Sequence, residues 1–130
     1  MGIIHTGDIH LRNHIIGRLT ACVGDAQNAV DEIKRVCLEE KEIDSNTILI
    51  LGGDIWDLKL PEVNLLTMVQ SMVLELYTAG IPTYFIEGNH DASPHVGYSW
   101  GSLVGAESIH GKSIKWCNHT IYGLNNMKRD

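Results

Sequence analysis

The sequence predicts an α/β fold in which short parallel strands alternate with helices and a β-hairpin follows. Apolar runs typical of buried strands occupy residues 2–6, 47–51 and 82–86. Between them, apolar residues recur at helical spacing over residues 25–40 and 61–79. Strand, helix, strand, helix, strand is the order of right-handed crossovers, so we expect a parallel sheet with helices on its faces.

Each expected helix has recognisable ends. Asp25 is a suitable N-cap for the first helix, which we expect to run to about Glu40. Pro61 suits the first turn of the second helix, and Gly80 suits its carboxyl end. The apolar stripe expected along this second helix comprises Val63, Leu66, Val69, Met72 or Val73, and Leu76. Leu65, Met68, Met72 and Tyr77 widen this stripe, so a second buried face is an open alternative.

The C-terminal third has weaker signals. Residues 92–111 are rich in glycine and serine and predict a long loop with one short helical turn. Residues 113–123 alternate loosely and predict two short strands that form a hairpin turning near Asn118.

Composition narrows the class of protein. The chain has 130 residues, 44% of them hydrophobic and 20% charged, which fits one globular domain. The net charge of −6 argues against binding nucleic acid through bulk positive charge, although bound divalent metal would let acidic groups face a phosphate. Three cysteines without a C-x-x-C pair predict neither a disulfide framework nor a thiolate zinc site. We therefore expect a cytoplasmic protein with no membrane association.

Polar residues that can bind metal follow each of the three strands. Asp8 and His10 follow the first strand, Asp54 follows the second, and Asn89 and His90 follow the third. Parallel strands present their carboxyl ends at one edge of the sheet, which is where open α/β sheets place their sites. We expect these five side chains to gather there. The alternative is that glycine-bounded turns carry such residues by coincidence.

The mixture of donors suits two divalent ions that share a bridging ligand. Asp54 is the candidate bridge, with Asp8 and His10 on one ion and Asn89 on the other. His90 would then face a phosphate, where an imidazole stabilises charge or protonates the leaving oxygen. A metal-bound water would attack phosphorus.

Four further residues lie near these motifs without a settled role. Asp57 is expected to support a ligand or to cap a helix, and Asp91 is grouped with it as a supporting residue. His14 either reaches a phosphate or lies on the surface. His95 is a candidate replacement ligand.

Three motifs together resemble a known family. Gly7-Asp8-Ile9-His10, the run from Gly53 to Asp57 and Gly88-Asn89-His90-Asp91 are similar to the first three motifs of the calcineurin-like metallophosphoesterases. Details resemble most the nuclease subunit of the SbcCD-type (SbcD) DNA double-strand-break repair complexes, including phage versions. These details are Asp-Ile-His-Leu-Arg at 8–12, Asp-Ile-Trp-Asp at 54–57 and Ala-Gly-Ile-Pro-Thr at 79–83.

The resemblance implies the N-terminal half of a four-layer α/β/β/α sandwich. It also implies a dinuclear site, with manganese usual in the nuclease branch, and phosphodiester cleavage in DNA by an exonuclease. The family's metal-binding roles carry over to Asp8, His10, Asp54 and Asn89, and its catalytic histidine to His90. The implied partners are DNA, an ABC-type ATPase subunit and a second copy of the chain in a homodimer.

The sequence also departs from the family. In the family, a later histidine and a Gly-His-x-His motif complete the coordination of both ions. In this chain only His95, His110 and His119 follow His90. We therefore expect residues 1–130 to form a single, truncated domain that holds two ions, one or none by itself. Two alternatives to a DNA nuclease stay open: a phosphatase of small phosphomonoesters or cyclic nucleotides, and a non-catalytic assembly partner of a full-length nuclease complex.

Overall fold

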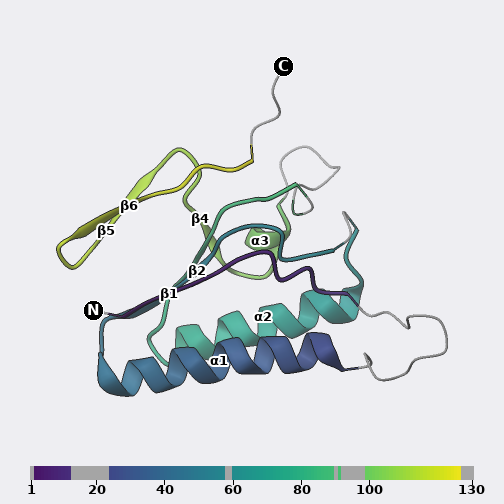
Figure 1. Ribbon diagram of the computed structural model, residues 1–130, viewed down its shortest axis with the longest axis horizontal. Coiled ribbons are helices and arrows are strands. Elements are labelled where there is room, and N and C mark those ends of the chain that lie inside the picture. Colours follow the sequence, from purple (N-terminus) through teal and green to yellow (C-terminus); the bar gives the residue numbers. More distant parts are fainter. Residues whose placement is uncertain (1, 13–23, 58–59, 90, 92–98, 127–130) are drawn as a thin grey trace.

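Four parallel strands form the main sheet, in the order β1-β2-β3-β4 (Figure 1). The structure is a computed structural model that describes residues 2–12, 24–57, 60–89, 91 and 99–126. The strands are β1 (Gly2–Thr6), β2 (Thr47–Leu51), β3 (Thr83–Phe85) and β4 (Glu107–Ser108). The predicted α/β fold with parallel strands is confirmed.

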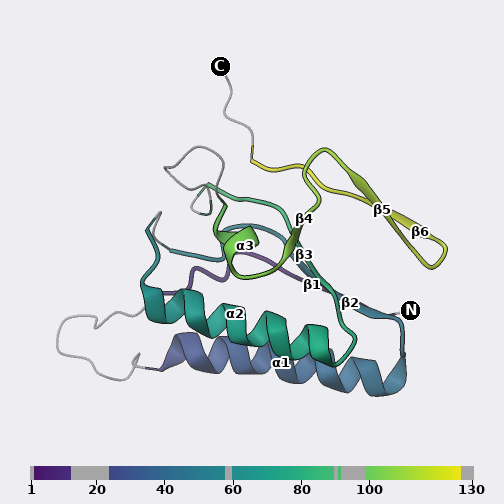
Figure 2. The same ribbon diagram turned by 180° about the vertical axis from the view of Figure 1, so that it is seen from behind.

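Helices α1 (Asp25–Ile43) and α2 (Val63–Thr78) cover the same face of this sheet (Figures 1 and 2). The strands stand in sequential order, so successive right-handed crossovers pass on the same side. The two helices also contact each other along their length. Neither α1 nor α2 covers the loops that directly follow β1 and β2, where Asp8 and Asp54 lie.

The core lies between β2 and the two helices. All five residues of β2 are buried, as expected for a continuously apolar parallel strand. Each buried leucine or isoleucine side chain contributes about 1.5–3 kcal/mol of hydrophobic stabilisation. The fully buried members of this cluster, those at most 2% exposed, are Val30, Cys37, Leu49, Leu51, Trp56, Leu65, Val69, Leu76 and Ile81.

Helix α1 is longer than predicted and begins differently. Gly24 is its N-cap, in the left-handed region with φ 94°, and Asp25 is the first helical residue. The predicted capping role of Asp25 is therefore wrong, although a carboxylate in the first turn still favours the helix dipole. The helix continues past Glu40 to Ile43 because its charged last turn is good helix-forming sequence.

Helix α2 begins later than predicted and is rotated. Its N-cap is Glu62, so Pro61 precedes the helix and is not in its first turn. Val63 is 77% exposed, although the sequence analysis placed it on the buried stripe. The stripe expected from the sequence was ambiguous because apolar residues occur on every side of this helix. The residues that the structure buries are Leu65, Val69, Met72, Val73 and Leu76.

Among the described residues of the C-terminal third, one strand was not predicted from the sequence. The short helix α3 (Trp100–Leu103) agrees with the expected helical turn, but β4 was not foreseen. Two residues are too short for a period to be seen, and β4 exists through its pairing with β3. The predicted hairpin is confirmed as β5 (Ser113–Trp116) and β6 (His119–Tyr122), which project away from α1 and α2 (Figure 2).

Candidate metal centre

The loops that follow β1 and β2 stay paired beyond the strands. The backbone N–H of Asp8 donates to Gly53 O at 2.9 Å, and that of His10 donates to Asp54 O at 3.0 Å. A parallel bridge between Leu11 and Trp56 continues the register of the strands. This pairing carries the candidate ligands of both loops on adjacent, hydrogen-bonded backbone.

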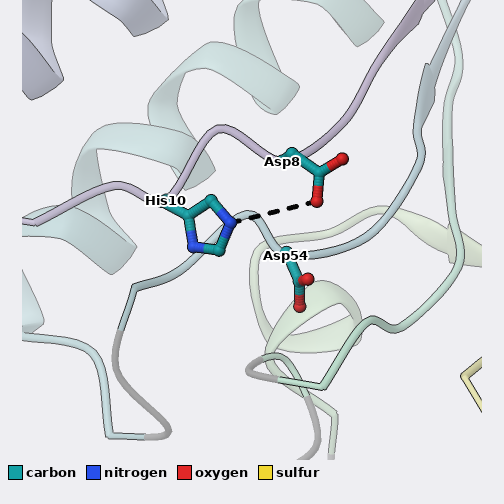
Figure 3. A group of neighbouring side chains, drawn as sticks. All are labelled: Asp8, His10 and Asp54. Carbon is teal, nitrogen blue, oxygen red and sulfur yellow. Dashed lines mark ion pairs between the residues drawn. The ribbon is translucent and has the colours of Figure 1, made fainter.

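The side chains of Asp8 and His10 point toward each other, and Asp54 lies beside them (Figure 3). Each offers one ligand atom, and these atoms all lie within 4.8 Å of one another. His10 Nε2 lies 3.9 Å from Asp8 Oδ1, drawn as the dashed line in Figure 3. The Asp8 side chain is 84% exposed and that of His10 40%, so the group opens to solvent.

All three residues adopt a left-handed backbone conformation. The φ angles are 52° at Asp8, 50° at His10 and 49° at Asp54. A residue with a side chain pays about 1–2 kcal/mol in this region, less for aspartate, so three in one cluster is unusual. Strained backbone that the surrounding fold maintains is concentrated at functional sites. The backbone thus supports a functional role that proximity alone would not establish.

Two glycines bring the loop after β3 against the loop after β2. Gly53 has φ 95°, and a Cβ there would lie 3.0 Å from the backbone nitrogen of Gly88. A Cβ on Gly88 would overlap the backbone nitrogen and Oδ1 of Asp54. Only glycine at both positions permits this close approach. Gly88, the first residue of the third motif, therefore lies directly beside Asp54.

The buried carboxylate of Asp91 joins these two loops. Asp91 is 3% exposed, and its Oδ1 accepts hydrogen bonds from the backbone N–H groups of Ile55 at 2.9 Å and Trp56 at 3.3 Å. Its Oδ2 accepts from the N–H of Gly88 at 2.9 Å. With both oxygens used on backbone donors, Asp91 supports the loops that carry Asp54 and Asn89.

Asp57 lies behind His10. Its Oδ1 is 3.5 Å from His10 Nδ1, and its Oδ2 accepts a hydrogen bond from Arg12 Nη1 at 2.9 Å. A carboxylate beside one nitrogen of a metal-binding imidazole orients the ring. The alternative role of Asp57 as a cap does not apply to α2, whose N-cap is Glu62.

Asn89 lies on the third loop and is exposed. Its Oδ1 accepts a hydrogen bond from Nδ2 of Asn126. The predicted catalytic residue His90, and the candidates His14 and His95, lie outside the described residues.

Several polar residues around the site were missed by the sequence analysis. Glu87, Asn125 and Asn126 form a hydrogen-bonded group beside Asn89. Burial raises the pKa of the Glu87 carboxyl above its usual range, and the charge of Asp91 adds to this, while a hydrogen bond with Ser99 opposes it. Spacing along the sequence offers no signal for pairs this far apart.

The donor set fits a divalent ion. Two carboxylates and one imidazole suit hard to borderline ions such as Mn²⁺ or Zn²⁺. Within the described residues, no other group of three or more His, Cys, Asp or Glu side chains has metal-binding geometry. A metal held here would contact groups from both the first and the second motif.

Comparison with known proteins agrees with this geometry. The family model for calcineurin-like phosphoesterases matches residues 1–128. A search of curated proteins found no match. None of the helices in the described part of the chain is long and apolar enough to cross a membrane. The match over residues 1–128 shows that the chain belongs to the calcineurin-like phosphoesterase family, whose members typically bind divalent metal ions.

Proposed function

We propose that this chain is a metal-dependent phosphodiesterase of the DNA-nuclease type. The observation that carries the proposal is the convergence of Asp8, His10 and Asp54, each in the left-handed region, after the carboxyl ends of β1 and β2. An exposed cluster of this kind is accessible to a large phosphodiester such as a DNA strand. The family match supports hydrolysis of a phosphoester.

In this proposal, each residue of the centre has a separate role. Asp8 and His10 would hold one divalent ion, Asn89 would help to hold a second, and Asp54 would contribute to the binding of both. A bound divalent ion supplies Lewis acidity and a water ionised near neutral pH. Asp57 faces His10 Nδ1 at 3.5 Å and keeps Nε2 directed at Asp8. His90, next to Asn89 in the chain, protonates the leaving oxygen.

The nuclease branch is supported by sequence details around these ligands. Asp-Ile-His-Leu-Arg at 8–12 and Asp-Ile-Trp-Asp at 54–57 resemble the nuclease subunits of DNA double-strand-break repair complexes. In the structure, the last residues of these two segments are joined, because Arg12 Nη1 donates a hydrogen bond to Asp57 Oδ2. Manganese is the proposed metal, and linear duplex DNA the proposed substrate.

An end-labelled DNA assay tests the proposal. The chain would be incubated with Mn²⁺ and linear duplex DNA, alongside p-nitrophenyl phosphate and bis(p-nitrophenyl) phosphate. We expect DNA cleavage and diester hydrolysis, both abolished by Asp54→Ala and retained by Asp31→Ala, an exposed aspartate on α1. If the chain hydrolysed only the monoester, its function would be that of a small-substrate phosphatase and not that of a nuclease.

A second candidate function, assembly with another protein, is favoured by the outer surface of α2. Leu74 and Tyr77 are 63% and 72% exposed, and Leu103 nearby is 48% exposed. Leu74 and Tyr77 line a shallow hollow of about 380 Å³ together with Val104 and Gly105. Exposed apolar side chains beside a hollow are typical of an interface.

The proposed occupant of this surface is a second copy of the chain, and the ATPase subunit of a repair complex is the competing one. Light scattering would give the mass of the chain in solution, and Leu74→Ser with Tyr77→Ser would convert a dimer to a monomer. A monomeric wild-type chain would exclude the homodimer. A wild-type chain that forms a stable dimer but does not cleave DNA would favour an assembly role over a catalytic one.

A further inference from the structure

Residues 125 and 126 contact the loop that carries Asn89, although they lie far from it in the sequence. The backbone N–H of Glu87 donates to Asn125 Oδ1 at 2.8 Å, and Asn125 Nδ2 donates to Glu87 Oε2 at 3.2 Å. The backbone N–H of Asn126 donates to Glu87 O at 2.8 Å. Three hydrogen bonds therefore join this short segment to a single residue, two positions before Asn89.

A fourth hydrogen bond reaches the candidate ligand itself. Asn126 Nδ2 donates to Asn89 Oδ1. A carboxamide has an oxygen end that binds metal and an NH₂ end that does not, and rotation by half a turn exchanges them. A donor on the oxygen fixes which end is presented. The carbonyl oxygen has two lone pairs, so one remains for a metal when Asn126 occupies the other.

The segment is itself held in place by the turn that precedes the hairpin. The backbone N–H of Asn125 donates to His110 Nδ1 at 3.0 Å. Gly111 N–H donates to Gly123 O at 2.9 Å, and Gly123 N–H donates to Lys112 O at 3.3 Å. These bonds fix the path of the chain where it leaves β6. Asn126 therefore approaches Asn89 from an anchored backbone.

We propose that Asn126 is a positioning residue for Asn89, orienting the carboxamide oxygen of Asn89 toward the metal centre, and that Asn125 fixes the loop beneath it. The inference rests on the proposed function for the metal role of Asn89. Residues that hydrogen-bond to metal ligands determine ligand orientation, and their loss typically weakens metal affinity about 10- to 100-fold. The Asn126 contact is exposed, so we expect the lower end, about tenfold.

A metal-free measurement tests the orientation directly. Nuclear magnetic resonance relaxation of the ¹⁵N-labelled Asn89 side chain would be recorded for the wild-type chain, Asn126→Ala, Asn126→Gln and Asn118→Ala. Asn118 lies exposed in the hairpin turn and serves as the matched control. We expect the Asn89 side chain to become disordered in Asn126→Ala, to recover partly in Asn126→Gln and to be unaffected in Asn118→Ala.

Hydrogen exchange separates this role from a merely structural one. The backbone N–H of Glu87 bonds to Asn125, so its protection should be unchanged in Asn126→Ala and lost in Asn125→Ala. An Asn89 side chain equally ordered in the wild-type chain and in Asn126→Ala would overturn the inference. So would a global loss of protection in Asn126→Ala, because the residue would then be structural.

A calorimetric titration with Mn²⁺ then separates this inference from the proposed function. We expect Asn126→Ala to bind one ion about tenfold more weakly than the wild-type chain and Asn118→Ala. Equal affinity in all variants would overturn the positioning role and leave the proposed function standing. A wild-type chain that binds no Mn²⁺ would overturn the proposed function, and the ligand-positioning role with it.

Discussion

Asp91 accepts a hydrogen bond of 2.9 Å from the backbone N–H of Ile55, which lies 36 positions earlier in the chain. This bond joins the loop of the third motif to the loop of the second. Because Asp91 is buried, loss of this hydrogen bond should be strongly destabilising: a buried donor without a partner keeps the full free-energy penalty of desolvation.

Asp91→Ala should destabilise the protein by about 3 kcal/mol, since bonds to a charged acceptor contribute about 1.5–3 kcal/mol each. Urea unfolding monitored by circular dichroism measures this change. Asp91→Asn, which keeps one acceptor oxygen, should lose less than Asp91→Ala. Asp31→Ala on the exposed face of α1 should change stability by less than about 0.5 kcal/mol. An Asp91→Ala protein as stable as the wild type would show that the carboxylate does not join the loops.

Asp57→Asn should weaken metal binding without unfolding the chain. The carboxylate lies 3.5 Å from His10 Nδ1, and its loss removes the group that orients the ring. We expect affinity for Mn²⁺ to fall about 10- to 100-fold in a calorimetric titration. Arg12→Gln removes the other partner of Asp57 and should have the smaller effect. Equal losses in both variants would indicate that the Arg12 ion pair, and not the contact with His10, is what matters.

Gly88→Ala adds a single methyl group but should strongly disrupt the candidate metal centre. The added Cβ would overlap Asp54 N and Oδ1, so either the loop or the candidate bridging carboxylate must move. We expect loss of metal binding and a lower melting temperature. Gly111→Ala is the comparison, because its Cβ would meet no atom within 4 Å, although its φ of 64° adds backbone strain. A Gly88→Ala chain that binds metal normally would contradict the close approach of the two loops.

The two described cysteines should differ in reactivity. Cys37 is 0% exposed, and burial raises the pKa of its thiol to about 11, so it stays protonated at pH 8. Cys117 is exposed in the turn of the hairpin. Iodoacetamide followed by peptide mass spectrometry should find Cys117 modified and Cys37 unmodified. Because the pKa of Cys37 is raised in the folded state, its contribution to stability should be lost as pH rises from about 9 toward 11. Rapid alkylation of Cys37 in the folded protein would contradict its burial.

The sequence predicted the elements whose patterns are long or continuous. β2 was clear because the residues after Thr47 form a continuous apolar run, and α1 because its apolar residues keep a helical period. The rotation of α2 was not predictable, since the exposed Val63 and Leu74 are as apolar as the residues that the structure buries. β4 depends on pairing with β3, which a two-residue segment does not reveal.

The candidate site was predictable to the extent that it depends on strand ends. Asp8, His10 and Asp54 converge because parallel strands align their carboxyl ends, a rule that needs no side-chain detail. The left-handed backbone at these residues is a property of the folded loops: aspartate and histidine adopt it more readily than most residues, but their presence does not predict it. The contact between Asn126 and Asn89 joins residues 37 positions apart, so only the fold brings it about.

A titration with Mn²⁺ tests most directly whether Asp8, His10 and Asp54 hold a divalent ion. Isothermal calorimetry would compare the wild-type chain with Asp54→Ala and with the control Asp31→Ala. We predict saturable binding by the wild type and by Asp31→Ala, and at least about tenfold weaker binding by Asp54→Ala. Equal affinity in all three proteins, or no binding by the wild type, would contradict the account.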